Sequence, residues 1–162
     1  MPTLPDLCGD LSMRIDRNGT WYYRGSPIGR HALVKLFSTV LRKDDAGQYW
    51  LTTPVENGRI DVEDAPFIGV ALRVERTGRN QVLFIRTNVD DEVMIDADHR
   101  LRVAHDDTTG EPRPYLHISN GLVALLTRPV FYELVEIGED GPEGAFGVWS
   151  SGQFFALGTL GD

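Results

Sequence analysis

The clearest hydrophobic pattern in the chain lies between residues 21 and 67. Large apolar side chains recur there at i, i+3, i+4, i+7 and i+8, a spacing that places them on one face of an α-helix. They are Leu33, Leu36, Phe37, Val40 and Leu41. Ser26 suits the N-cap, Pro27 suits the first helical position, and the turn residues at 43–47 are typical of a helix end. The pattern predicts an amphipathic helix whose apolar face packs on a sheet.

Alternating and aromatic segments on both sides of this helix predict the sheet. Asn18-Gly19 between the runs 13–16 and 20–23 is typical of a β-hairpin. Residues 49–53 are predicted to form the next strand, and Asn57-Gly58 to turn the chain into another at 59–62. The first half therefore has the order hairpin, helix, strand.

A longer strand is predicted at 67–77, followed by a return strand. If the turn at 78–79 has two residues, Ala71 lies opposite Arg86 and Arg73 lies opposite Phe84. Arg73 and Arg86 are then diagonal neighbours on one shallow face. A slip by one residue would move Arg86 to the other face.

The second half repeats the order of the first. A hairpin is predicted around 97–100, a short helix over 120–127, a strand over 130–137 and a last hairpin over 145–157. Three short motifs recur in the same order, although such apolar motifs also recur by chance: Ile15-Asp16 with Ile95-Asp96, Leu33-Val34-x-Leu36 with Leu122-Val123-x-Leu125, and Tyr49-x-Leu51 with Tyr132-x-Leu134. We predict an α+β chain of two small lobes, residues 1–88 and 89–162, from an internal duplication of a hairpin–helix–strand unit.

Composition narrows the class of protein. The single cysteine, Cys8, excludes an intramolecular disulfide and multi-thiolate metal sites. With neither an export signal nor a long apolar run, we expect a cytoplasmic protein. The net charge of −8 opposes binding to duplex nucleic acid or to a membrane. All but two of the 16 basic residues are arginine, which indicates either a specific anion pocket or a coding bias.

Signatures of common enzymes are absent, and we expect neither a cofactor nor a metal ion. The sequence has no Gly-x-Ser-x-Gly, Walker lysine loop or His-Glu-x-x-His. His105, Asp106, Asp107 and His117 could supply nitrogen and oxygen ligands to a metal ion, but their pattern favours a solvated loop.

Two features near the first helix have a structural and a functional interpretation. Glu63 and Asp64 could act as acid and base, or could hold the turn before Pro66 through hydrogen bonds to backbone amides. Arg30 lies one turn before Leu33, where it could reach into a cleft or cover apolar surface. An ion pair between Arg30 and either carboxylate fits both interpretations.

Several runs along the chain resemble the bacterial domain-of-unknown-function family DUF1285. They are Gly25-Ser26-Pro27-Ile28-x-Arg30, Thr53-Pro54-x-Glu56, Val62-Glu63-Asp64-Ala65-Pro66-Phe67, Arg113-Pro114-Tyr115-Leu116 and Val130-Phe131-Tyr132. The resemblance spans most of the chain. It implies a duplicated two-lobed fold, with a C-terminal lobe like pleckstrin-homology domains, and no established enzyme activity. It also implies a nucleotide-like ligand at the lobe interface and a role in signalling or stress response. A pleckstrin-type lobe usually ends in a long capping helix, but residues 138–162 contain too many glycines for one.

The resemblance and the strand register together give a set of candidate ligand-binding residues. Arg30, Glu63, Asp64, Arg113 and Tyr115 match the family pattern, whereas Arg73 and Arg86 come from the register alone. Arginine would bind phosphate, Tyr115 would stack or hydrogen-bond, and the carboxylates would orient the arginines or accept from a base or ribose.

We therefore predict a non-catalytic sensor or adaptor that binds a small anionic ligand such as a nucleotide and serves signal transduction, with a signalling protein as partner. Two alternatives stay open. One is a hydrolase that uses Glu63, Asp64 and a divalent cation. The other is a protein-interaction module that docks a partner on exposed strand edges or on its aromatic tail.

Overall fold

The computed structural model describes residues 10–54 and 57–159. The chain divides into two compact units. The first comprises Met1–Pro66 with Asn120–Leu122, and the second comprises Phe67–Ser119 with Val123–Asp162. Mixed α and β structure in two sheet-rich parts confirms the predicted fold class.

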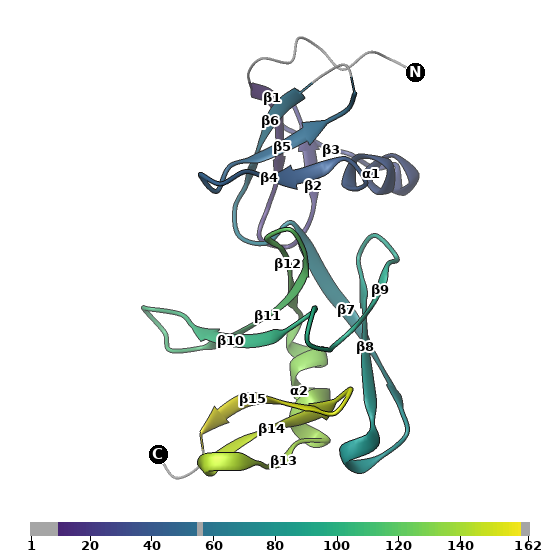
Figure 1. Cartoon of the computed structure of the whole chain (residues 1–162). Coiled ribbons are helices and arrows are strands. Elements are labelled where there is room, and N and C mark those ends of the chain that lie inside the picture. The colour runs from purple at the N-terminus through teal and green to yellow at the C-terminus, as the bar shows by residue number, and fades with distance from the viewer. Residues whose placement is uncertain (1–9, 55–56, 160–162) are drawn as a thin grey trace. The chain divides into compact units, whose positions relative to one another are not determined.

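The first unit is a six-stranded sheet with one helix (Figure 1). Its strands lie in the order β3-β2-β1-β6-β5-β4, and β1 and β6 are parallel whereas the other neighbours are antiparallel. The elements are β1 (Asp10–Ile15), β2 (Trp21–Tyr23), β3 (Ser26–Pro27), α1 (His31–Ser38), β4 (Leu41–Lys43), β5 (Tyr49–Thr52) and β6 (Asn57–Val62). The hairpin predicted around Asn18-Gly19 is confirmed by the pairing of β1 with β2. Asn57-Gly58 lies within β6, so the turn predicted there is wrong.

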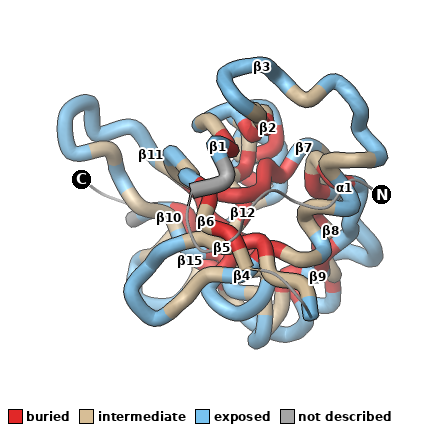
Figure 2. Tube along the Cα trace, turned by 90° about the horizontal axis from the view of Figure 1, so that it is seen from above, coloured by how far each residue is buried: buried red, intermediate tan, exposed pale blue. Residues whose placement is uncertain are grey.

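Helix α1 is shorter than the apolar pattern predicts. It begins at His31 with Arg30 as N-cap, while Ser26 and Pro27 form the short strand β3. Figure 2 shows the exposed segment before the helix, where only Ile28 is partly covered between residues 24 and 32. On the core face, Phe37 stacks on the buried Trp21 with ring centroids 6.2 Å apart.

The early end of α1 has a local cause. The hydroxyl groups of Ser38 and Thr39 donate to the carbonyls of Lys35 and Leu36, each at 2.7 Å, and such bonds compete with helix continuation. Val40 then accepts a hydrogen bond from the Thr52 amide at 2.9 Å and leads into β4. Leu36 stays 50% exposed, so the prediction of a fully buried five-residue face is wrong.

Asp44 organises the turn between β4 and β5. Its Oδ1 accepts from the amides of Ala46 and Gln48, each at 2.9 Å, and its Oδ2 accepts from Trp50 Nε1 at 2.8 Å. The Trp50 bond, followed by the Gln48 bond, lowers the pKa of Asp44 below its usual value of 3.8. The carboxylate therefore stays ionised in the folded state at a pH where the unfolded chain already binds a proton.

This depressed pKa predicts an acid-dependent loss of stability. A carboxyl group with a lower pKa in the folded state stabilises the fold above the unfolded pKa, and that contribution is lost as pH falls through the folded pKa. We expect Asp44→Asn to lower the melting temperature at pH 7 and to weaken its decline below about pH 4. Thermal melts between pH 7 and acid check this. The exposed neighbour Asp45 supplies the control: Asp45→Asn should change neither the melting temperature at pH 7 nor its decline in acid. Identical pH profiles for the two variants would contradict the role of Asp44.

The second unit contains two sheets and the helix α2. Its six-stranded sheet has the order β10-β11-β12-β7-β8-β9, with β12 parallel to β7, and its three-stranded sheet has the order β13-β14-β15. The elements are β7 (Phe67–Glu75), η1 (Gly78–Asn80), β8 (Val82–Thr87), β9 (Glu92–Met94), β10 (Leu101–His105), β11 (Pro112–Ser119), β12 (Leu122–Leu126), α2 (Arg128–Glu136), β13 (Glu139–Asp140), η2 (Pro142–Gly144), β14 (Ala145–Ser150) and β15 (Gln153–Thr159).

The register predicted for the β7–β8 hairpin is confirmed. Ala71 pairs with Arg86 and Arg73 pairs with Phe84. The connection is the 3₁₀ turn η1 rather than a two-residue turn, yet the pairing is the same. The last hairpin, β14 with β15, is also confirmed.

Helix and strand are exchanged between residues 120 and 137 relative to the prediction. The segment predicted as a helix is β12, in which Leu122, Ala124 and Leu126 are the buried alternate residues. The segment predicted as a strand is α2, which buries Val130 and Leu134 one turn apart. Thr127 caps this helix, because its side chain accepts from the Val130 amide at 3.5 Å and Pro129 lies in the first turn.

The repeated order of elements is therefore not found. Two of the three recurring motifs fall on a helix in one half and a strand in the other. The hairpin predicted around residues 97–100 does not form either, because β9 pairs with β8 and β10 pairs with β11. Asp96 instead closes a turn by accepting from the amides of Asp98 and His99, each at 2.9 Å. The likeness to pleckstrin-homology domains stays a prediction.

The core of the second unit joins both of its sheets to α2. Leu83, Ile85, Leu116, Leu134, Val148 and Phe155 are among its buried members. The buried hydroxyl of Ser150 donates to the Ile95 carbonyl at 2.6 Å and accepts from the Leu83 amide at 2.9 Å. A boundary after residue 88, as predicted, would fall between the paired strands β8 and β9, whereas the units divide at residues 66 and 67.

Candidate functional site

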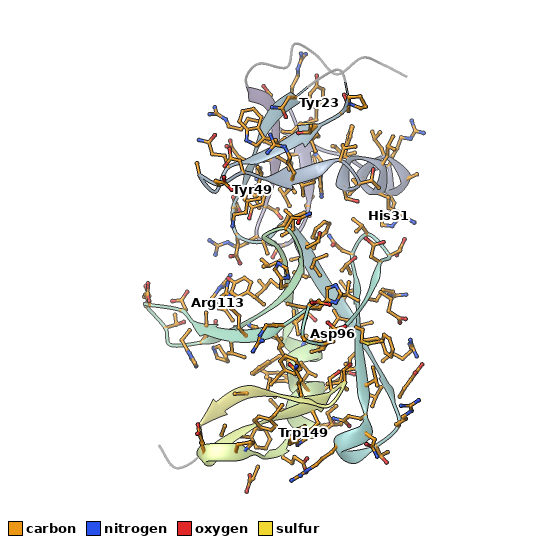
Figure 3. The ribbon with its side chains drawn as sticks, in the orientation of Figure 1. Tyr23, His31, Tyr49, Asp96, Arg113 and Trp149 are labelled. Atoms are coloured by element: carbon orange, nitrogen blue, oxygen red, sulfur yellow. The ribbon has the colours of Figure 1, made fainter. Side chains whose placement is uncertain are left out.

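Two of the predicted ligand-binding residues lie together on β11. Arg113 and Tyr115 are two residues apart and therefore share one face of the strand. The neighbouring strand β10 places Arg102 directly opposite Tyr115. Figure 3 labels Arg113 on this hairpin. The three side chains form what we call the arginine–tyrosine cluster.

Contacts within the arginine–tyrosine cluster are close. Arg113 Nε donates to Tyr115 Oη at 2.9 Å. The guanidinium carbons of Arg102 and Arg113 lie 4.9 and 5.8 Å from the centroid of the Tyr115 ring. Tyr115 is only 8% exposed, whereas Arg102 is exposed and Arg113 half-buried. The cluster thus presents two guanidinium groups on one fixed aromatic ring.

The charges around the arginine–tyrosine cluster are mixed, with a carboxylate near Arg113 and, among the described residues, none paired with Arg102. Asp106, at the end of the hairpin, accepts from the amides of Thr108 and Thr109 at 2.8 and 2.9 Å. These bonds, with a smaller contribution from Arg113, lower the pKa of Asp106.

Sequence reasoning missed Arg102. It placed residues 101–103 in a hairpin with 94–96, which would put Arg102 away from Tyr115. Only the β10–β11 register brings Arg102 opposite this ring. Alternation along 101–103 did predict a strand, but not its pairing partner.

Arg73 and Arg86 lie on one face as predicted, but Arg73 is already paired with carboxylates. Its Nε and Nη2 donate to Glu92 at 2.9 and 2.7 Å, and its Nη1 pairs with Glu75. Its guanidinium also lies over the Phe84 ring, 4.0 Å from the centroid. These contacts, led by Glu92, raise the pKa of Arg73 and lower that of Glu92. An anion at Arg73 would have to displace both carboxylates.

The other three candidate residues belong to the first unit. Glu63 accepts from the Arg17 amide at 2.8 Å and lies 3.7 Å from Arg14 Nη1, so it braces the turn between β1 and β2. Arg30 has an exposed side chain, and its carbonyl accepts the first hydrogen bonds of α1. Burial, with an added effect of the Asp64 charge, raises the pKa of the Tyr49 phenol. Glu63 thus has a structural role in its hairpin.

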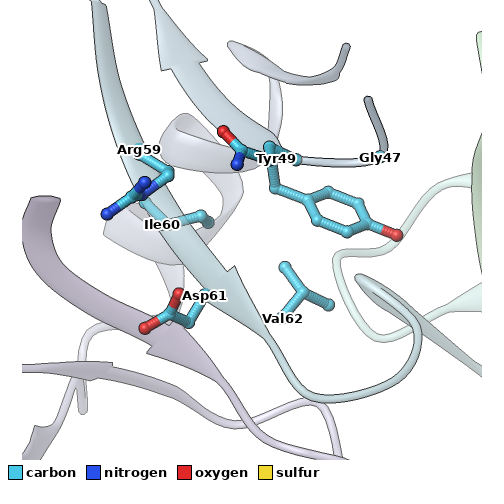
Figure 4. A pocket seen from close by; sticks show the side chains of 7 residues that line it. Gly47, Tyr49, Arg59, Ile60, Asp61 and Val62 are labelled. Carbon is cyan, nitrogen blue, oxygen red and sulfur yellow. The ribbon is translucent and has the colours of Figure 1, made fainter. Parts of the chain in front are cut away.

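A shallow pocket of about 240 Å³ lies in the first unit (Figure 4). It is lined by Gly47, Gln48, Tyr49, Arg59, Ile60, Asp61 and Val62. None of the seven predicted ligand-binding residues is among them. Within the described parts of the chain, neither Arg59 nor Asp61 makes an ion pair, so the pocket offers a guanidinium and a carboxylate to a ligand.

Residues 10–54 and 57–159 contain no group of three or more His, Cys, Asp or Glu side chains that could hold a metal ion. The candidate set at His105, Asp106, Asp107 and His117 therefore does not assemble. Cys8 lies outside the described residues. No helix in the described chain has the length and apolar character needed to cross a membrane.

Comparisons with known proteins identify the relatives of this chain. Residues 3–65 match the model of the DUF1285 N-terminal domain, a domain of unknown function, and residues 66–157 match the DUF1285 C-terminal domain. No curated protein matches the chain.

Two crystal structures are similar to this one. A DUF1285 family protein from Silicibacter pomeroyi DSS-3 is 47% identical, with a TM-score of 0.90, covering 96% of this chain and 84% of that one. A DUF1285 family protein from Shewanella baltica OS155 is 29% identical, with a TM-score of 0.59, covering 76% of this chain and 90% of that one. Both domain models and both structures agree, and the chain belongs to the DUF1285 family, whose function is uncharacterised.

Proposed function

We propose that this protein is a non-catalytic sensor or adaptor that binds a small, phosphate-bearing ligand such as a nucleotide at the arginine–tyrosine cluster. The observation that carries the proposal is the placement of Arg102 and Arg113 on one tyrosine ring, with Arg102 exposed and without an ion pair in the described chain. Arg30, Glu63, Asp64, Arg73 and Arg86 stay predictions, with less support from their contacts.

The chemistry of the cluster suits an oxyanion. Two cations near one ring repel each other, and a bound anion offsets that repulsion. Arginine presents its donors in a planar fork that matches phosphate or carboxylate. The bond to Tyr115 orients the Arg113 guanidinium before binding, so less conformational entropy is lost when a ligand arrives.

Removal of either arginine should weaken binding. In a thermal-shift screen of nucleotides, coenzymes, cyclic dinucleotides and inorganic phosphates, a bound compound at a hundredfold excess over Kd stabilises the protein by about 2.7 kcal/mol. We expect Arg102→Ala and Arg113→Ala each to raise the Kd of that compound about tenfold or more, because each deletes hydrogen bonds to a charged group.

Arg79 supplies the matched control. It is an exposed arginine in the same unit, and its guanidinium carbon lies 5.0 Å from the centroid of the Trp149 ring. Arg79→Ala should leave the shift unchanged. Equal losses in all three variants would indicate general electrostatics, and an unchanged Kd in Arg102→Ala and Arg113→Ala would refute the proposed site.

The two alternative functions have less support. A hydrolase would need the Glu63 carboxylate, which already accepts from the Arg17 amide. An interaction module using the aromatic tail would need exposed side chains, whereas Phe155 and Leu157 are buried in the core of the second unit. Turnover abolished by Asp64→Asn, or co-purification of one partner, would favour these alternatives.

A further inference from the structure

One face of the first unit's sheet carries aromatic and cationic side chains in register. Trp50 on β5 pairs with Arg42 on β4 and with Arg59 on β6. Directly opposite residues in a sheet share a face, so the indole has a guanidinium on each side. Leu41 and Leu51, which alternate with these residues, are buried on the other face. We call the row Arg42, Trp50 and Arg59 the tryptophan row.

Hydrogen bonds fix the tryptophan row before any ligand binds. Trp50 Nε1 donates to the Asp44 carboxylate at 2.8 Å, which satisfies the polar edge of the indole. Arg42 Nε donates to Thr52 Oγ1 at 3.0 Å, and Thr52 in turn donates to Asn57 Oδ1 at 2.6 Å. The half-buried ring and one neighbouring guanidinium are therefore held in place, a feature that lowers the entropy cost of binding.

A second aromatic and arginine pair lies on the same face. The Arg14 guanidinium carbon is 3.9 Å from the centroid of the Tyr22 ring. Arg14 pairs with Tyr22 on one side and with Asp61 on the other, and Asp61 shares its face of β6 with Arg59. Tyr22 and Trp50 are separated by three strand spacings, about 14 Å, across the sheet and by two residues, about 7 Å, along the strands.

Carboxylates moderate the charge of this face. Asp44 is bound to Trp50, and Asp16 accepts from the Tyr22 hydroxyl at 3.2 Å and from the amides of Asn18 and Thr20. Asp61 makes no ion pair within the described chain. Aromatic surface, more than net positive charge, distinguishes the face.

We infer that this sheet face binds single-stranded nucleic acid, with one base stacked on Trp50, its flanking phosphates at Arg42 and Arg59, and a further base on the Arg14 guanidinium that covers the Tyr22 ring. Every base has an aromatic face, so stacking platforms with interleaved arginines bind single strands with little sequence preference. Two platforms on an open sheet suit an extended strand better than one enclosed small molecule. A duplex keeps its bases stacked inside and presents denser charge to a chain whose net charge is −8.

Fluorescence anisotropy tests this inference with a labelled single-stranded RNA of about twelve nucleotides at low salt. We expect saturable binding by the full chain. Trp50→Ala should raise Kd about tenfold or more through loss of stacking, and Trp50→Phe should recover most of the affinity. Arg42→Ala and Arg59→Ala should each reduce the slope of log Kd against log salt by about 0.7.

Controls separate this inference from the proposed function and from a purely structural role. Arg102→Ala and Arg113→Ala should leave RNA binding unchanged, so either site can fail alone. The thermal melt of each variant shows that it is folded. Wild-type protein that fails to bind, an unchanged Kd in folded Trp50→Ala, or a duplex bound as tightly as the single strand would overturn the inference. Equal affinity for a mononucleotide would also overturn it, since the second platform would then contribute nothing.

Discussion

Gly147→Ala is expected to destabilise the protein by about 2–3 kcal/mol, near the upper end of the usual range for overpacking. A Cβ at this position of β14 would meet the carbonyl oxygen of Phe155 and the Cα of Ala156 on the paired strand β15. Both are backbone atoms and cannot rotate away, so the two strands would have to separate at the bulge between Phe146 and Gly147. Urea denaturation of the variant and the wild-type protein measures this loss.

Gly158 provides a matched control in the same hairpin. It pairs with Phe146, and a Cβ built on it would have no atom within 4 Å. Gly158→Ala should therefore change the free energy of unfolding by no more than about 0.5 kcal/mol. Similar stability of the two variants would show that β14 and β15 do not approach as closely at Gly147 as described.

Leu134→Ala is expected to cost about 2–5 kcal/mol, the usual range for removing a fully buried leucine side chain. Leu134 is 0% exposed on α2 and belongs to the core of the second unit, with Val130 one turn before it. The substitution removes apolar contacts and leaves a cavity that the surrounding sheets can only partly fill. The measurement is again the free energy of unfolding in urea.

Tyr132→Ala is the control that tests the helix itself. Tyr132 is 60% exposed, so its removal should change stability by no more than about 0.5 kcal/mol. In a strand, Val130, Tyr132 and Leu134 would share one face and would be buried together. In a helix, residues two apart point in different directions. A large loss in both variants would favour the strand and contradict α2.

Local signals explain why much of the first half was predictable. The Asn18-Gly19 turn and the alternation along β7 and β8 act over a few residues, and both the first hairpin and the β7–β8 register agree with the prediction. The end of α1 was not predictable from apolar spacing. Val40 and Leu41 continue the helical period, yet Val40 precedes β4 and Leu41 is its first residue.

Non-local pairing explains the errors in the second half. The apolar run 122–126 fits either a helix or a strand, and its parallel pairing with β7, through Ala124 and Phe67, decides for the strand. Thr127 followed by Pro129 was a readable helix start for α2. The apparent repeat of Tyr49-x-Leu51 at Tyr132-x-Leu134 favoured the strand there instead.

The candidate site was predictable only where its residues are close in sequence. The spacing of Arg113 and Tyr115 places them on one face of any strand, and β11 supplies that strand. Arg102 and the carboxylate of Glu92 come from β10 and β9, whose pairing partners the sequence pattern assigned wrongly. Residues brought by neighbouring strands were therefore the ones that sequence reasoning missed.

Whether the arginine–tyrosine cluster binds an anion can be read from the side-chain Nε–H resonances of Arg102 and Arg113. Adenosine monophosphate and inorganic pyrophosphate are the probes for a titration followed by NMR. We predict that both resonances shift together and saturate, with those of Arg79 and Arg73 unmoved, and that Arg102→Ala raises the ligand concentration at which the Arg113 resonance shifts by about tenfold or more. Saturable shifts elsewhere, or none at Arg102 and Arg113 with either probe, would contradict anion binding at this cluster.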